Sequence, residues 1–84
     1  MSDKRTLKVR TGMWVKVRGA ILGQETFEDV YQFVPIDEVD ITQNKISMDS
    51  PLGQALAGAK VGETAKVETG GGVLDLVVLD LGHG

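Results

Sequence analysis

The sequence contains one short segment with the features of a helix, and most other segments alternate apolar and polar residues as β-strands do. This pattern restricts the possible folds more than any other feature. Ser50 and Pro51 form a typical helix start, because serine caps the first free amides and proline at the first helical position gives up no needed donor. Small and apolar residues then recur at helical spacing, namely Leu52, Ala55, Leu56 and Ala59. Gly58 and Gly62 end the helix after about two turns. One short helix beside several strands indicates an α+β layer architecture.

The first half of the chain predicts three strands. Residues 13–19 place Met13, Val15 and Val17 on one face of a strand that ends at Gly19. Residues 26–34 are rich in aromatic and β-branched side chains and predict a second strand, which Pro35 stops. The acidic, turn-prone residues 36–45 indicate a connecting loop that has room for a short helical turn. The sequence KISM then predicts a short third strand.

Two more strands follow the helix. In residues 64–69 we expect Ala65, Val67 and Thr69 to face inward and Lys66 and Glu68 to face outward. Residues 70–72 are three glycines, which are typical of a hairpin connection. Residues 73–81 are apolar on both faces, so we expect them to form an interior strand covered by the helix on one side. The predicted order is three strands, one helix and two strands, forming an antiparallel sheet.

Composition excludes several classes of function. The chain has 84 residues, enough for one small domain, and no cysteine, so disulfides and thiolate zinc sites are excluded. No apolar run approaches the roughly 18 residues of a membrane span, and the N-terminus lacks the apolar region of a secretory signal. We expect a cytoplasmic protein with no membrane contact.

Charge is unevenly distributed along the chain. Residues 1–18 hold six basic side chains and one acid, while residues 19–84 hold three basic side chains and eleven acids. The functional interpretation is a basic end that meets phosphate and an acidic body that meets a basic protein surface. The simpler interpretation is a solvated arm on a soluble body, and it is favoured because no aromatic residues interleave the basic ones. We therefore divide the chain into a basic arm (1–10), a domain (11–81) and a tail (82–84).

Residues with catalytic or metal-binding chemistry are few. His83, the single histidine, is predicted to lie in a frayed tail that cannot hold an imidazole for catalysis. The three glycines lack the lysine and spacing of a phosphate-binding loop. Asp37, Glu38 and Asp40 form an acidic cluster without the pattern of a calcium loop, which leaves a solvated loop or a partner-facing patch. We expect no catalytic residue, no metal site and no cofactor.

The segment DEVDITQNKISMDSPLGQALAGAKVGETAKVETGGGVLDLVVLDL resembles the C-terminal domain of the bacterial GreA/GreB transcript-cleavage factors. The central match comprises Ile46-Ser47, Ser50-Pro51, Ala55-Leu56, Gly58 and Val61-Gly62-Glu63, preceded by the acidic stretch Asp37-Glu38-Val39-Asp40. The segment departs from the family at Gly70, where the family has proline. The resemblance extends over roughly residues 11–81.

This resemblance implies a fold and a partner. The implied fold is FKBP-like: a strongly bent antiparallel sheet of five strands around one short helix. The implied partner is RNA polymerase, bound through the β′ subunit coiled-coil at the rim of the secondary channel. The family's contacts, carried over to this chain, fall on Ser47, Asp49 and Pro51. Asp49 fits this role because Ser50 already fills the helix cap.

The resemblance also implies a missing activity. Gre factors have an N-terminal coiled-coil whose acidic tip helps hold the catalytic magnesium of the polymerase. Here only about ten residues, with a net positive charge, precede the matching domain, and they contain no heptads. We therefore expect a monomeric polymerase-binding module that modulates elongation and does not itself stimulate transcript cleavage.

Two other classes of function remain open. The fold type suggests an FKBP-like peptidyl-prolyl isomerase, a chaperone or another small protein-interaction domain, although Trp14, Phe27, Tyr31 and Phe33 are few aromatics for an isomerase pocket. A small nucleic-acid binder that uses the basic arm is the other alternative. Direct nucleic-acid binding is not our expectation, because the arm lacks aromatic residues.

Overall fold

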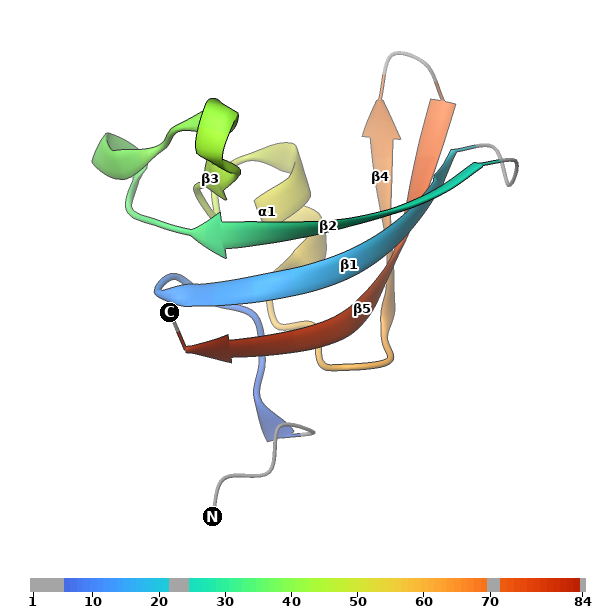
Figure 1. Ribbon diagram of the computed structural model, residues 1–84, viewed down its shortest axis with the longest axis horizontal. Helices are drawn as coiled ribbons and strands as arrows, with labels where there is room; N and C mark the ends of the chain where they lie inside the picture. The colour runs from blue at the N-terminus through green and yellow to red at the C-terminus, as the bar shows by residue number, and fades with distance from the viewer. Residues whose placement is uncertain (1–5, 22–24, 70–71, 84) are drawn as a thin grey trace.

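Five strands form a single sheet in the order β3-β2-β1-β5-β4 in the computed structural model (Figure 1). The structure describes residues 6–21, 25–69 and 72–83. Its elements, in chain order, are β1 (Met13–Ile21), β2 (Glu25–Phe33), the 3-10 helices η2 (Ile36–Glu38) and η3 (Ile41–Gln43), β3 (Lys45–Ile46), the helix α1 (Pro51–Leu56), β4 (Thr64–Thr69) and β5 (Gly72–His83). The predicted order of strands and helix is confirmed.

The sheet is mixed, which corrects the prediction that it is wholly antiparallel. β1 pairs antiparallel with β2 and β5, and β4 pairs antiparallel with β5. β3 instead runs parallel to β2, with Gln32 opposite Lys45 and Phe33 opposite Ile46. The reason is that Pro35 ends β2 and the two 3-10 helices carry the chain back, so β3 runs in the same direction as β2.

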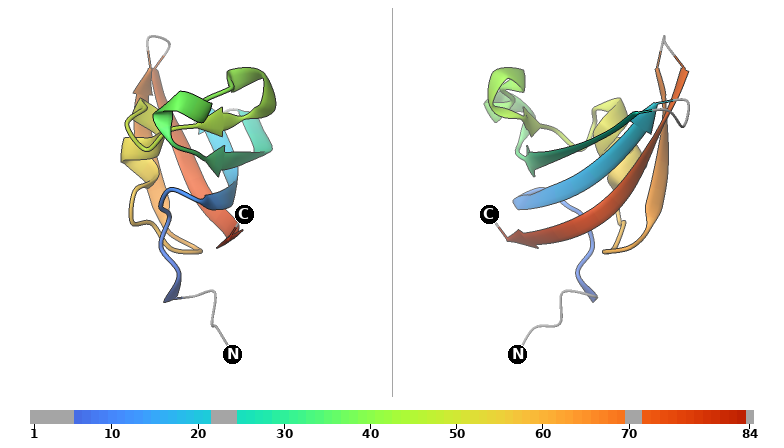
Figure 2. Two further views of the ribbon diagram at one scale, coloured as in Figure 1. Left: turned by 90° about the vertical axis from the view of Figure 1, so that its left-hand side faces the viewer. Right: turned by 45° about the vertical axis from the view of Figure 1, so that its right-hand side comes forward.

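The long strands curve around the helix (Figure 2). The pairing of β1 with β5 shifts register between Lys16 and Val17, and such a bulge increases local bend and twist. The concave side of the sheet and α1 enclose the core, whose buried residues are Val9, Met13, Val15, Val17, Phe33, Leu56, Val67, Leu76, Val78 and Leu81. β5 lies between β1 and β4, so the prediction of an interior last strand is confirmed.

The predicted faces of β1 are confirmed, but the strand does not end at Gly19. Gly19 pairs with Phe27 of β2, and β1 continues to Ile21. A side chain at Gly19 would collide with the Phe27 ring, which occupies the space beside it. Glycine therefore serves here to admit an aromatic neighbour on the next strand.

Residues near both ends of the described chain take part in the core or the sheet, although the sequence predicted an arm and a tail there. Val9, within the predicted basic arm, is 2% exposed and lies in the core cluster. Its backbone exchanges hydrogen bonds with the turn after α1, donating to the Ala59 carbonyl at 2.9 Å and accepting from the Gly58 amide at 3.0 Å. Gly82 and His83, within the predicted tail, continue β5 and pair with Trp14 and Met13.

The second half of the sheet follows the predicted alternation where it is described. Val67 is buried and Ala65 packs against the core, while Lys66 and Glu68 are exposed. Thr69 lies opposite Gly72 in the register of β4 and β5. Of the predicted glycine hairpin, residues 70 and 71 lie outside the described part of the chain.

Candidate protein-binding site at the start of the helix

The loop between β3 and α1 is fixed by the capping serine. The Ser50 hydroxyl accepts a hydrogen bond from the Gly53 amide at 3.0 Å and donates one to the Ser47 carbonyl at 2.7 Å. Its own amide donates to the same carbonyl at 3.2 Å. Pro51 occupies the first turn of α1, as predicted, and supplies a fixed backbone angle there. One side chain therefore stabilises both the helix start and the loop before it.

Gly53 brings the loop and the helix unusually close together. A Cβ atom at Gly53 would overlap the Ser47 carbonyl oxygen and lie 2.7 Å from the Met48 Cα. Both neighbours are backbone atoms, so neither can rotate away. Sequence reasoning missed this residue, although a glycine inside a helix that has only six residues was a usable signal.

The three residues of the predicted polymerase contact have different environments. Asp49 and Pro51 are exposed, whereas Ser47 is only 8% exposed. The Gln54 side chain donates to the Asp49 carbonyl at 3.2 Å and so ties the loop to α1. Within the described part of the chain, the Asp49 carboxylate has no hydrogen-bond or ion-pair partner. Asp49 and Pro51 can meet a partner directly, and Ser47 supports them through its backbone.

The acidic cluster separates into two parts. Asp37 and Glu38 are exposed on η2. The Asp40 carboxylate instead caps η3, accepting from the Thr42 amide at 3.1 Å and the Thr42 hydroxyl at 2.6 Å. Among the residues described, no three side chains of the types that ligate metals come together. The part of the cluster available to a partner is therefore Asp37 and Glu38.

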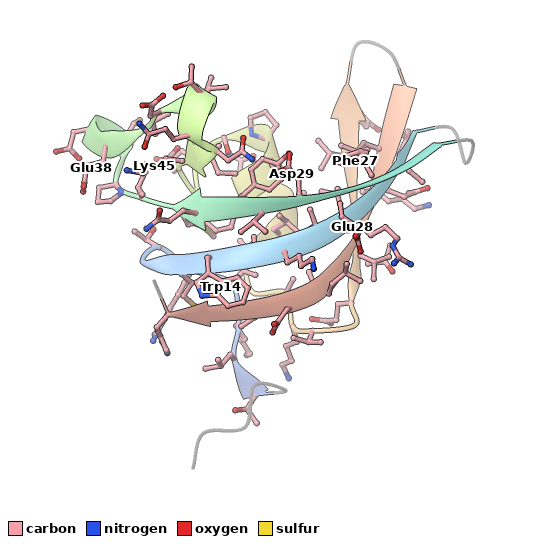
Figure 3. The ribbon with its side chains drawn as sticks, viewed as in Figure 1. Trp14, Phe27, Glu28, Asp29, Glu38 and Lys45 are labelled. Carbon is pink, nitrogen blue, oxygen red and sulfur yellow. The ribbon has the colours of Figure 1, made fainter. Side chains whose placement is uncertain are left out.

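Three of the four aromatic residues lie on the core-facing side of β2, and the fourth, Trp14, lies on the other face of the sheet. Phe33 is fully buried in the core. The Trp14 ring lies over Gly82, and strand alternation places it on the face opposite Met13 and Val15. Phe27, labelled in Figure 3, and Tyr31 lie on the same side of β2 and pack against the core. Three of the four aromatics therefore face the core from β2, where Phe33 fills it and Phe27 and Tyr31 pack against it.

Two hollows on the surface formed by the described residues bear on the isomerase alternative. One of about 300 Å³ is lined by Thr6, Leu7, Lys8, Arg10 and Met13, and one of about 220 Å³ lies against the turn after α1. Neither contains an aromatic side chain, so neither supports the isomerase alternative. No helix in the described part of the chain is long and apolar enough to cross a membrane.

Comparison with known proteins identifies the family. A family model described as "Transcription elongation factor, GreA/GreB, C-term" matches residues 4–82. The chain is 42% identical over 79 residues to the transcription elongation factor GreA of Caldanaerobacter subterraneus subsp. tengcongensis, covering 94% of this chain and 48% of the relative. It is 37% identical over 80 residues to the GreA of Christiangramia forsetii, covering 95% and 49%.

A solved structure supports the same relationship. The crystal structure of GreA factor homolog 1 (Gfh1) of Thermus thermophilus superposes with a TM-score of 0.74 at 26% identity, over 100% of this chain and 53% of that one. The chain thus spans about half the length of the curated relatives that it matches. It belongs to the GreA/GreB family of transcription elongation factors and corresponds to their C-terminal domain.

Proposed function

We propose that this domain is a non-catalytic RNA polymerase-binding module that docks on the β′ subunit coiled-coil at the rim of the secondary channel. It modulates elongation there and does not itself stimulate transcript cleavage. The observation that carries the proposal is the exposed Asp49 carboxylate, held next to Pro51 on a loop with fixed geometry in a domain of the GreA/GreB family. We further propose that it acts in the cytoplasm as a monomer.

The chemistry of the loop suits a basic partner surface. A carboxylate without an internal partner accepts charge-assisted hydrogen bonds from arginine or lysine. Pro51 adds an exposed apolar contact whose backbone is already restricted, so little conformational entropy is lost on binding. The Ser50 cap keeps both groups in place before the partner arrives.

The placement of the remaining polar groups supports a binding role without chemistry. His83 is an exposed residue at the end of β5. Asp37 and Glu38 point from η2, and the Asp40 carboxylate is engaged within its own turn. These groups do not converge on one another, as an acid–base pair would have to.

The test uses core RNA polymerase and a complete Gre factor. We expect the labelled domain to bind the polymerase and to reduce transcript cleavage stimulated by the complete factor, because both compete for one site. Asp49→Ala removes the charged contact and should raise the Kd at least tenfold, equivalent to about 1.4 kcal/mol.

Glu68→Ala is the matched control, since Glu68 is an exposed carboxylate on β4, away from this loop. It should leave the Kd within about twofold. The proposal fails if the domain does not bind, or if Asp49→Ala and Glu68→Ala have the same affinity as the unchanged chain.

A further inference from the structure

The connection between β2 and β3 exposes an unusual amount of apolar surface. Ile36 is 71% exposed and Ile41 is 78% exposed, and Val39 between them is 40% exposed. These three side chains, named the apolar tip below, are three of the five large hydrophobic residues found exposed in the described part of the chain. The segment that carries them projects beyond the end of the sheet (Figures 1 and 2).

The apolar tip does nothing for the core that would explain its composition. None of its residues belongs to the buried cluster or packs against it. Several exposed apolar side chains within one short segment favour a place where another molecule binds, because burial then removes them from water. The residue types here favour an interface over a solvated loop.

The segment is held in one conformation by its own hydrogen bonds. The Glu38 amide donates to the Pro35 carbonyl at 2.9 Å, which closes η2. Asp40 and Lys45 exchange two backbone hydrogen bonds, each of 2.9 Å, across the base of η3. Thr42 donates twice to the Asp40 carboxylate. A preorganised surface loses little entropy on binding, which is what a docking site requires.

Charge around the apolar tip selects the kind of partner. Asp37 and Glu38 are exposed next to Ile36, and no ion pair involves either carboxylate among the described residues. Lys45, at the base, is the single basic residue in positions 35–46 (Figure 3). A complementary surface has an apolar centre and arginine or lysine at its rim. Two copies of this chain meeting tip to tip would bring like charges together, which disfavours a symmetric dimer.

We propose that the apolar tip, with Asp37 and Glu38, is a second docking surface for a protein patch that is apolar at its centre and basic at its edge. This proposal rests on the proposed function, because it takes RNA polymerase as the protein that carries the patch. The domain is then attached at two points, the loop around Asp49 and the apolar tip.

The experiment measures the affinity of variants of the full chain for core RNA polymerase. The double variant Ile36→Ser/Ile41→Ser should raise the Kd at least tenfold while leaving the thermal unfolding midpoint unchanged, because both side chains lie outside the core. Val73→Ser is the matched control: Val73 is 40% exposed on β5 and lies outside the apolar tip, so this variant should bind as the unchanged chain does.

A second variant tests the acidic rim. Asp37→Asn/Glu38→Gln keeps the size of both side chains and removes their charge. The Kd should rise about threefold to tenfold at low salt, and its dependence on salt should become shallower.

The outcomes separate this proposal from the proposed function. If the chain binds and Asp49→Ala weakens it, but Ile36→Ser/Ile41→Ser binds as tightly as Val73→Ser, the apolar tip is not a docking surface and the proposed function stands. If the unchanged chain does not bind, both proposals are overturned. Sedimentation that shows self-association abolished by Ile36→Ser/Ile41→Ser would also overturn this inference in favour of a second copy.

Discussion

Gly53 decides how the candidate binding loop is positioned. Its missing side chain lets the backbone of Ser47 and Met48 lie directly on α1. The position is buried, and every alternative side chain adds atoms where backbone atoms already stand. Residue identity here controls the geometry of Asp49, which lies one residue beyond Met48 in the same loop.

Replacing Gly53 by alanine tests the close packing of the loop on α1, because the substitution has two opposite effects on the free energy of unfolding. Alanine is the better helix former by about 1 kcal/mol. Crowding against rigid backbone costs about 1–3 kcal/mol. We expect crowding to dominate, so Gly53→Ala should lower the free energy of unfolding in urea and weaken polymerase binding. An increase in stability, as helix propensity alone predicts, would contradict the close packing of the loop on α1.

Tyr31 gives the domain a dependence on alkaline pH. Burial raises the pKa of the Tyr31 phenol, and the nearby Asp29 charge and its hydrogen bond raise the pKa further. Because the folded pKa lies above the unfolded value of about 10, stability is fully present below pH 10 and falls as the pH rises through the folded pKa. Tyr31 is the only tyrosine, so the pH-dependent rise in absorbance at 295 nm reports its ionisation alone, above the constant absorbance of Trp14.

Two variants separate the effect of the Asp29 charge on the pKa of Tyr31 from the effect of burial. Asp29→Asn should lower the pKa of Tyr31 but leave it above its ordinary value, because burial remains. Tyr31→Phe should remove its share of the stability loss above pH 10. A Tyr31 titration centred at its ordinary value in the unchanged chain would show that the phenol is neither buried nor influenced by Asp29.

At the scale of helices and strands, sequence features that act between near neighbours predicted the elements well. The pairing of strands distant in the sequence could not be predicted from these features. The cap, the proline and the helical spacing of Leu52, Ala55 and Leu56 act within a few residues, and each is present as predicted. The helix nevertheless ends at Leu56, before the predicted stop at Gly58, and Ala59 lies beyond it. The alternation of β1 is equally local. Parallel pairing of β3 with β2 depends instead on how the intervening chain returns, which alternation does not encode.

Asn44 shows how that return is made. It adopts a left-handed conformation, with φ of 57°, which reverses the chain at the end of η3. Its side chain donates to the Asp29 carboxylate at 2.8 Å and to the Val30 carbonyl at 3.1 Å. The Asn44 side chain thus binds β2 at Asp29 and Val30, which precede Gln32, the first β2 residue that pairs with β3. The sequence marked this position only as turn-prone.

In the candidate binding site, too, the local features were predictable from the sequence and the long-range contacts were not. The role of Ser50 as a cap could be predicted because it depends on neighbours in the chain. Whether Asp40 was free or engaged, and whether Ser47 was exposed, depended on contacts formed only in the fold. Asp49 and Pro51 are in fact exposed, whereas Ser47 contributes its carbonyl to the loop.

For the whole molecule, the fold places acidic residues beside the two basic residues of β1, Lys16 and Arg18. Arg18 forms an ion pair with Glu28 of β2 at 3.3 Å. Lys16 stands opposite Asp80 of β5 in the strand register. The fold therefore places acidic residues from later strands next to these basic residues. This distribution gives little support to a nucleic-acid-binding face that includes the basic residues of β1.

The N-terminal segment contributes to the core, and removing it tests the domain boundary. Burial of the Val9 side chain contributes about 1.5–3 kcal/mol, and its two backbone hydrogen bonds contribute about 0.5–1.5 kcal/mol each. A chain that begins at Thr11 should therefore unfold at lower urea concentration than the full chain, by at least 2 kcal/mol in the free energy of unfolding.

Two point variants separate the apolar contact from the charge of the segment. Val9→Ala should reproduce about 1–3 kcal/mol of the loss, because it leaves a cavity between α1 and the sheet. Lys8→Ala, at the exposed neighbouring position, should change the free energy of unfolding by less than about 0.5 kcal/mol. Equal urea midpoints for the full chain and for residues 11–84 would mean that the segment docks on the domain without stabilising it. A loss in Lys8→Ala as large as that in Val9→Ala would show that charge, not burial, fixes the segment.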